Sequence, residues 1–206
     1  MNRLELVGRS SSPFTRTARI FALELGVPHA FRPVLDLTSL DAAHYAGNPA
    51  LKIPILLDER GPLFGTENIC RELTRRSGKA PQVVLRGDVS ERVVANAEEL
   101  TLHTMAAEVS LIMAKMAGDA SLGPPKLARS IAGSLGHLDE NVDLVLAALP
   151  PGRALSFVEV ALYCLVTHLP FRQVLDVTPW ARLNAFCQRF GEREGARGTA
   201  YRFDAA

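Results

Sequence analysis

The sequence predicts an α+β segment followed by an all-helical segment, and three observations predict this order. Short apolar runs at 4–8 and 55–57 alternate with helical patterns up to about residue 78. From about residue 91 onward, apolar side chains recur at helical spacing almost throughout. Between the two segments, the stretch 77–90 is interrupted by glycine and proline and is typical of a linker. We therefore expect an N-terminal domain over 1–80 and a C-terminal helical domain over 88–206.

The first strand and helix have clear start and stop signals. A strand is expected over 4–8, and a helix over 14–25 because its apolar residues recur every three or four positions. Ser12 suits the N-cap of this helix and Pro13 suits its first position. Gly26 is expected to stop the helix in the left-handed conformation.

The rest of the N-terminal segment contains further short strands and helices. Pro33 predicts an edge position for the second strand, because proline donates no backbone hydrogen bond. Thr66 is expected to cap the last helix of this segment, which ends near Gly78. In order, we expect a strand over 30–35, a short helix within 36–47, a strand over 55–57, a hairpin turn over 58–62, a return strand from 63, and a helix from 65 to 78.

The C-terminal segment is expected to consist of helices. The run Ser156-Phe-Val-Glu159 fits a capping box, with serine at the N-cap and glutamate at N3. The helix that it opens is apolar nearly all round and is therefore expected at the centre of the helical segment. Tyr201 and Phe203 are candidates to anchor the polar tail. The expected helices cover 91–117, 126–149, 157–169 and 178–193, with a break over 118–125.

The composition indicates an ordinary globular protein. Of 206 residues, 48% are hydrophobic and 22% charged, and the formal net charge of +1 attracts neither nucleic acid nor anionic lipid. No apolar run reaches the roughly 18 residues of a membrane span, and no signal-peptide core begins the chain. Three widely spaced cysteines (Cys70, Cys164, Cys187) predict neither a disulfide framework nor a metal site. We expect a cytoplasmic protein with reduced thiols and no nucleic-acid or membrane partner.

Four motifs occur together in a fixed order. They are Ser-Pro-Phe-x-Arg over 12–16, Asn-Pro-x-x-Lys-Ile-Pro over 48–54, Glu-Asn at 67–68, and the capping box over 156–159. With these motifs the whole chain resembles the cytosolic glutathione S-transferases, most closely the bacterial omega-like and zeta-like branches. The resemblance implies a thioredoxin-like N-terminal domain and glutathione as cosubstrate without a metal. It also implies a homodimer that detoxifies a hydrophobic electrophile held by the helical domain.

The resemblance assigns the catalytic role to Ser12. A free thiol has a pKa of about 8.5, so only a few per cent is thiolate at neutral pH. A hydroxyl that donates to the sulfur and the positive end of a helix both favour the thiolate. Lowering the pKa by about two units corresponds to about 3 kcal/mol. Ser12 as an N-cap alone is the competing interpretation, and Ser10 and Ser11 compete for the same role. Ser11 and Phe14 are expected to contact the cofactor.

The other two motifs are expected to hold the tripeptide. The resemblance implies a cis bond before Pro54, which turns the backbone of Ile53 toward the cysteinyl segment of glutathione; a trans bond is the alternative. Lys52 reaches either the glycyl carboxylate or solvent. Glu67 and Asn68 open a helix whose N–H groups suit the γ-glutamyl carboxylate, with Glu67 accepting from the ammonium group. The competing interpretation of Glu67 is that it only places a favourable charge at the helix N-terminus. The family usually has serine where this chain has Asn68.

Several other polar and sulfur-containing side chains have two interpretations. Arg16 and Arg19 could steer anionic glutathione, although a solvated helix face is the default. His168 and Tyr163 lie on the predicted central helix and are expected to be satisfied core groups. The set His103, Met105, Met113 and Met116 fits a core stripe better than a pocket lining.

Four functions follow, with conjugation of glutathione to an electrophile first. The second is a non-catalytic binding or stress protein of the same fold, which Asn68 and the triple-serine loop favour. The third is a glutathione-dependent isomerase of the zeta type, which needs a small basic pocket. Thiol–disulfide exchange is disfavoured because Ser12 stands where omega-like relatives carry cysteine.

Overall fold

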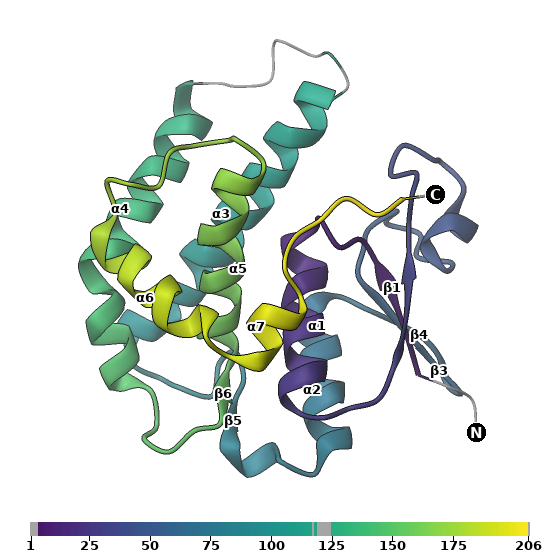
Figure 1. Cartoon of the computed structure of the whole chain (residues 1–206), viewed down its shortest axis with the longest axis horizontal. Helices are drawn as coiled ribbons and strands as arrows, with labels where there is room; N and C mark the ends of the chain where they lie inside the picture. Colours follow the sequence, from purple (N-terminus) through teal and green to yellow (C-terminus); the bar gives the residue numbers. More distant parts are fainter. Residues whose placement is uncertain (1–3, 117, 119–124, 206) are drawn as a thin grey trace. The chain divides into compact units, whose positions relative to one another are not determined.

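The computed structural model describes residues 4–116, 118 and 125–205, which form two compact units (Figure 1). The first unit comprises residues up to Leu85 together with those from Glu192 onward, and the second comprises Arg86–Gly191. The expected ranges, 1–80 and 88–206, differ from this division mainly in the tail. The tail belongs to the first unit because its residues are bound by side chains of the first helix, as described below.

The first unit is built on a mixed sheet in the order β2–β1–β3–β4. β1 is parallel to β2 and antiparallel to β3, which forms a hairpin with β4. β2 is an edge strand, as Pro33 predicted. This is the expected thioredoxin-like arrangement, and the helices α1 and α2 pack against each other beside the sheet (Figure 1). The bounds are β1 Glu5–Gly8, α1 Pro13–Glu24, β2 Ala30–Pro33, η1 Ala42–Tyr45, β3 Ile55–Asp58, β4 Gly61–Phe64, α2 Thr66–Ser77, η2 Ala80–Gln82 and β5 Val83–Val84.

One face of this sheet carries a compact apolar cluster. Val7 and Ile55 lie opposite each other in the β1–β3 pairing, and both are completely buried. Val34 and Tyr45 join them, and partly buried apolar residues of β3, β4 and the segment between β2 and β3 pack against the cluster. Alternation along the strands places Leu6 and Leu56, both buried, on the other face. The sheet is therefore buried on both faces.

Helix ends follow the sequence with one correction. Ser12 is the N-cap of α1, and its Oγ accepts a hydrogen bond from the Thr15 backbone N–H at 3.2 Å, as predicted. The prediction that Thr66 caps α2 is wrong. Gly65 is the N-cap with φ of 89°, a conformation that favours glycine, and no side chain caps the helix. Gly78 ends α2 in the left-handed conformation, as expected.

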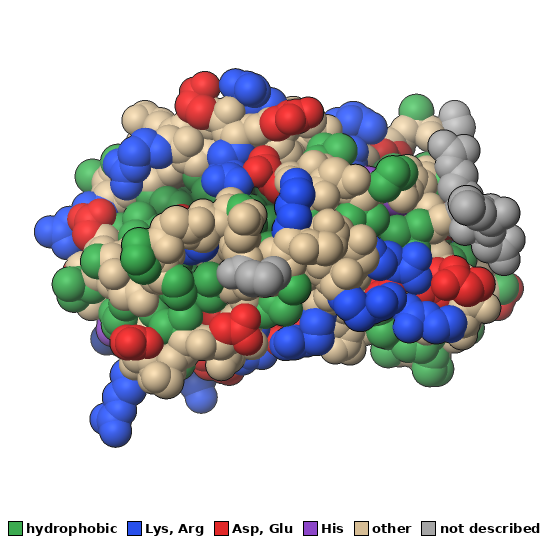
Figure 2. All heavy atoms as spheres, turned by 90° about the horizontal axis from the view of Figure 1, so that it is seen from below, with side chains coloured by type: hydrophobic (Ala, Val, Ile, Leu, Met, Phe, Trp, Pro, Cys, Tyr) green, Lys and Arg blue, Asp and Glu red, His purple; other side chains and the backbone are tan. Residues whose placement is uncertain are grey.

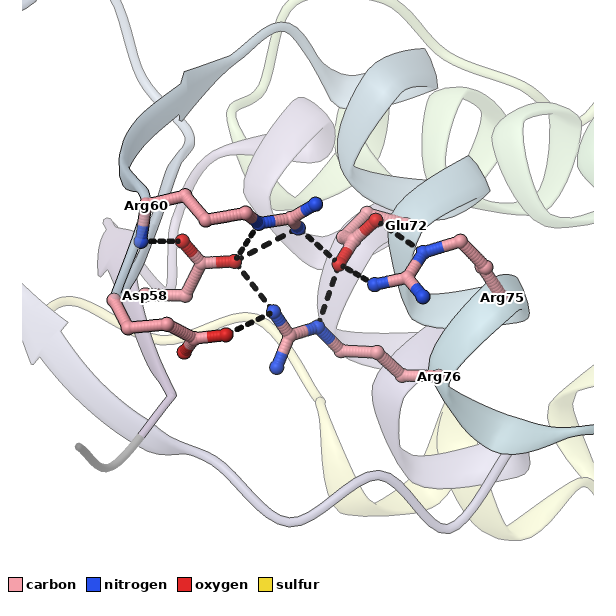
Figure 3. Close-up of polar contacts among 6 residues, drawn as sticks. Asp58, Arg60, Glu72, Arg75 and Arg76 are labelled. Atoms are coloured by element: carbon pink, nitrogen blue, oxygen red, sulfur yellow. Dashed lines mark hydrogen bonds and ion pairs between the residues drawn. The ribbon is translucent and has the colours of Figure 1, made fainter. Parts of the chain in front are cut away.

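A network of ion pairs joins the β3–β4 hairpin to α2 (Figure 3). Glu72 Oε1 accepts from Arg60 at 2.5 Å, from Arg75 at 2.7 Å and from Arg76 Nε at 2.7 Å. Arg60 and Arg76 also bind Asp58 at the end of β3. Hydrogen bonds from Arg75 and then Arg76 lower the pKa of Glu72 to about 2, against the opposing effect of burial. Glu72 is thus the centre of this network.

The second unit is a bundle of helices in which α3 packs against α4 and α5, and α6 packs against α4 and α5. α5 is buried along almost its whole length, as predicted. The predicted positions of Ser156 at the N-cap and Glu159 at N3 are confirmed: Ser156 Oγ accepts from the Glu159 N–H at 3.3 Å and donates to the Glu159 carboxylate at 2.6 Å. The predicted break over 118–125 falls mostly outside the described residues. The bounds are α3 Arg92–Met116, α4 Pro125–Ala148, β6 Leu155–Ser156, α5 Phe157–Phe171 and α6 Ala181–Gly191.

The last predicted helix, 178–193, is shorter than expected. It is α6, which ends at Gly191, and a separate short helix, α7 (Glu194–Gly198), follows in the first unit. The chain changes unit between the two helices, so the polar segment that follows Gly191 does not continue α6. Among the described residues, no helix combines the length and the apolar character that a membrane span requires. On the face drawn in Figure 2, basic and acidic side chains are interspersed.

A buried polar pair lies between α3 and α5. His168 Nδ1 is 2.8 Å from Glu108 Oε1, and both side chains are almost completely buried, in line with the expected core role of His168. Burial raises the pKa of Glu108, although the nearby His168 opposes this shift. Met105 is fully buried, whereas Met116 is 59% exposed. The predicted core stripe therefore holds for Met105 and is wrong for Met116 and for His103, which is also exposed.

Replacing Glu72 with glutamine tests the ion-pair network. Its pKa of about 2 lies below the unfolded value of about 4.3. The network therefore contributes its full stability above the unfolded pKa, and this contribution is lost as the pH falls from about 4.3 to about 2. We expect Glu72→Gln to lower the free energy of unfolding at pH 7 by about 1–2 kcal/mol and to flatten its acid dependence. Denaturant unfolding across this pH range measures both.

The matched control is Glu59→Gln, because Glu59 is 60% exposed and its carboxylate lies 3.8 Å from Arg76. Glu59→Gln should change the free energy of unfolding and its acid dependence little. If Glu72→Gln kept the acid dependence of the wild type, Glu72 would not be the centre of the network.

Replacing Glu108 with glutamine tests the buried pair. Because the pKa of Glu108 is raised on folding, its contribution is fully present below about pH 4.3 and is lost as the pH rises through the folded value. Glutamine does not titrate. The free energy of unfolding of Glu108→Gln should therefore rise relative to that of the wild type as the pH rises. Unfolding measured from pH 4 upward tests this, with the exposed Glu99→Gln of the same helix as control. A difference that does not vary with pH would contradict the raised pKa.

Candidate functional site

Three loops of the first unit meet at one edge of the sheet. In the observed register, Val7 near the end of β1 pairs with Ile55 at the start of β3, and Ile55 pairs with Phe64 at the end of β4. The loop after β1, the segment before β3 and the loop after β4 therefore emerge side by side. These segments carry the predicted site residues Ser11, Ser12, Lys52, Ile53, Pro54, Glu67 and Asn68, with Phe14 at the start of α1.

Ser12 lies at the amino end of α1 with its side chain partly exposed. Its Oγ accepts from Thr15 N, and its backbone N–H donates to the Arg9 carbonyl at 3.0 Å. A hydroxyl that accepts one hydrogen bond keeps its own proton to donate. Ser12 can thus cap α1 and donate to a ligand at the same time, at a helix end that carries partial positive charge.

Its two neighbours are placed differently. The Ser10 side chain is fully buried, and its hydroxyl accepts from Arg19 Nη1 at 3.3 Å. Ser11 is 5% exposed. Of the three consecutive serines, Ser12 is the most exposed. The structure therefore favours Ser12 over Ser10 and Ser11 as the hydroxyl that can meet a ligand.

A close approach between strand and helix shapes this loop. A Cβ atom at Gly8 would lie 2.5 Å from Thr15 Cγ2, so any larger residue would force the two elements apart. The Arg9 N–H donates to Thr15 Oγ1 at 3.3 Å. The sequence interpretation missed Gly8 and Thr15, because a glycine at a strand end and a threonine in a first helical turn are both common.

The peptide bond between Ile53 and Pro54 is cis, as expected. Asn48 orders the preceding loop: its Nδ2 donates to the Lys52 carbonyl at 2.8 Å and its Oδ1 accepts from the Ala50 N–H at 3.0 Å. The Lys52 side chain is exposed, Ile53 is half-buried and Pro54 is buried. Asn48 was recognised only as part of a motif, and the signal for its role is an Asn-Pro pair in a loop.

The start of α2 offers backbone donors. The Ile69 N–H donates to the Gly65 carbonyl at 3.0 Å, which begins the hydrogen-bond ladder of α2. The amino end of the helix carries partial positive charge. Glu67 is partly buried there and Asn68 is exposed. Asn68 Nδ2 donates to the Phe64 carbonyl at 3.0 Å, which directs its side chain back toward β4. This arrangement suits an anion near the helix end.

The prediction of a solvated face for Arg16 and Arg19 is wrong. They are 4% and 8% exposed. Arg16 lies over the Tyr201 ring at 4.2 Å, and Arg19 over the Phe31 ring at 4.6 Å. Burial, followed by the nearby Arg202, lowers the pKa of Arg19. Arg16 is held by residues of the C-terminal tail, and Arg19 by Ser10 and the Phe31 ring.

Within the part of the chain that the structure describes, no group of three His, Cys, Asp or Glu side chains is placed to hold a metal ion. The residues at the three loops supply hydroxyl, backbone amide, carboxylate and ammonium groups. Such a set can bind a zwitterionic peptide and stabilise an anion at Ser12.

Comparison with known proteins finds a matching domain model and similar folds. Residues 11–76 match the family model of the glutathione S-transferase N-terminal domain. The GST-like protein YibF of Escherichia coli (strain K12), itself described as uncharacterized, is 25% identical over 175 residues, which is 83% of this chain and 84% of YibF.

Solved glutathione transferase structures are similar in fold to this chain over nearly its whole length. The glutathione-bound glutathione S-transferase of Methylobacillus flagellatus KT has a TM-score of 0.77 at 20% identity, covering 97% of this chain and 100% of that chain. A glutathione transferase family member from Pseudomonas fluorescens Pf-5, with bound glutathione, has a TM-score of 0.76 at 22% identity, covering 97% and 99%. This chain therefore carries a glutathione S-transferase N-terminal domain and has the glutathione S-transferase fold.

Proposed function

We propose that this protein is a glutathione S-transferase, which conjugates the glutathione thiolate to a hydrophobic electrophile held by the helical domain. The observation that carries the proposal is the register of β1, β3 and β4, which brings Ser12, Ile53 and Glu67 to one edge of the sheet. The glutathione-bound relatives support glutathione as the cosubstrate. A cytoplasmic homodimer and an omega-like or zeta-like assignment stay predictions from the family resemblance.

In the proposed reaction, Ser12 stabilises the thiolate of bound glutathione. Its hydroxyl donates a hydrogen bond to the sulfur, and the amino end of α1 adds partial positive charge. The thiol proton leaves to solvent. The sulfur then attacks the electrophilic carbon, a carbon–sulfur bond forms, and the leaving group departs with its electron pair. Proximity of the two substrates supplies much of the rate.

The remaining residues are proposed to hold the tripeptide. The γ-glutamyl carboxylate accepts from the first N–H groups of α2, and Glu67 accepts from the γ-glutamyl ammonium. The backbone of Ile53 pairs with the cysteinyl segment, and Lys52 reaches the glycyl carboxylate. One N–H of the Asn68 amide bonds Phe64, and the second is proposed to serve as the donor that serine provides in the family. Ser11, Phe14 and Pro54 are proposed to line the same site.

Replacing Ser12 with alanine tests the catalytic role. Without the hydroxyl, the thiol of bound glutathione should titrate at higher pH, and conjugation near pH 6.5 should fall by about ten- to a hundredfold because each pKa unit is a factor of ten. Ser12→Thr keeps a hydroxyl and an N-cap and is the control. The measurements are the thiolate absorbance of the bound cofactor and the conjugation rate as a function of pH.

The outcomes separate the candidate functions. Unchanged conjugation in Ser12→Ala would remove Ser12 from the mechanism but leave the family activity. Absence of binding heat at millimolar glutathione would end the proposal. Binding without turnover on a broad panel of electrophiles would favour a non-catalytic binding protein instead.

Replacing Glu67 with glutamine tests the ammonium contact. The loss of one charge-assisted hydrogen bond should weaken glutathione binding about tenfold, which corresponds to about 1.4 kcal/mol. N-acetylglutathione lacks the ammonium group, so the wild type and Glu67→Gln should bind it equally. Calorimetry with both ligands measures the four affinities. If Glu67→Gln lost the same affinity for glutathione and for N-acetylglutathione, Glu67 would not contact the ammonium group.

A further inference from the structure

The C-terminal tail of the first unit is fastened to α1. Glu24 at the end of α1 accepts from the Gly195 N–H at 2.7 Å and from Arg193 Nη2 at 2.5 Å. A Cβ atom at Gly195 would lie 2.8 Å from Glu24 Cγ, so a larger residue there would displace the Glu24 side chain. α7 thus lies against α1, and the tail runs on past it (Figure 1).

Arg16 holds the next part of the tail. Its guanidinium donates to the Ala196 carbonyl at 3.1 Å and to Thr199 Oγ1 at 3.4 Å, and it lies over the Tyr201 ring. Arg16 and Thr199 are both buried. A buried arginine with these partners fixes the path of the tail toward the amino end of α1.

The tail then reaches the loop that carries Ser12. Asp204 Oδ2 accepts a hydrogen bond from the backbone N–H of Ser10 at 2.7 Å, although the two residues are 194 positions apart in sequence. Ser10 is fully buried, and its hydroxyl accepts from Arg19. A buried backbone N–H needs an acceptor, and here the C-terminal tail supplies it.

We propose that Asp204 is a positioning residue, which sets the conformation of the loop 9–12 and through it the placement of the Ser12 hydroxyl. The inference rests on the proposed function for its catalytic consequence. Ser10 is two residues before Ser12, and the Ser12 N–H is itself bonded to Arg9 within the same tight turn. Release of the Ser10 N–H therefore loosens the turn that presents Ser12. The proposed glutathione contacts of Ile53 and Glu67 lie on other loops and are left in place.

The experiment compares Asp204→Ala and Asp204→Asn with the wild type. Asparagine keeps an oxygen that accepts from Ser10 and alanine does not. Phe203→Ala is the matched control in the tail, since Phe203 is 61% exposed. The first readout is hydrogen exchange of the Ser10 amide without glutathione. Asp204→Ala should exchange about tenfold faster, and Asp204→Asn and Phe203→Ala within about threefold of the wild type.

The second readout is conjugation as a function of pH. Asp204→Ala should lower kcat about five- to tenfold and move the pH profile upward, with the KM for glutathione changed less than about twofold. Asp204→Asn should recover most of this loss. A simple loss of stability would lower the melting temperature without moving the pH profile.

Unchanged exchange of the Ser10 amide in Asp204→Ala would overturn the contact. Faster exchange with an unchanged kcat and pH profile would overturn the positioning role. If the wild type neither binds nor turns over glutathione, the proposed function fails. Exchange then decides alone whether Asp204 anchors the loop.

Discussion

The pairing of Ile55 with Val7 on one side and Phe64 on the other is the constraint on which the candidate site depends. It places the end of β1, the start of β3 and the end of β4 at the same edge, so that three loops distant in sequence converge. A slip by one residue would move Val7 or Ile55 out of the buried cluster with Val34 and Tyr45. The packing of the core therefore fixes the geometry of the site.

The amino end of α1 is held from both directions. From the sheet side, Gly8 lets β1 approach Thr15 closely, and Thr15 in turn bonds Arg9 and Ser12. From the other side, the tail supplies Asp204 to Ser10 and surrounds Arg16. The proposed role of Ser12 requires its hydroxyl to be placed within a few tenths of an ångström, and this double support favours such precision.

Signals that lie within a few neighbouring residues made much of this fold predictable. Ser12-Pro13 specifies a helix cap, and Ser156 with Glu159 specifies another. The apolar run of α5 specifies burial on all sides. The long-range features were not predictable. Arg16 and Arg19 resemble ordinary surface arginines in sequence. The partners of Arg16 lie in the tail, about 180 residues away, and those of Arg19 lie in the loop before α1 and in β2. Gly65 displaced Thr66 as N-cap because the strand-to-helix turn needs a positive φ, which a propensity argument does not reveal.

A crystal structure with glutathione bound tests the central claim most directly. The proposed site predicts the glutathione sulfur within about 3.5 Å of Ser12 Oγ, with the γ-glutamyl carboxylate on the first N–H groups of α2. Glutathione bound away from these loops, or with its sulfur facing another group while Ser12 only caps α1, would contradict it.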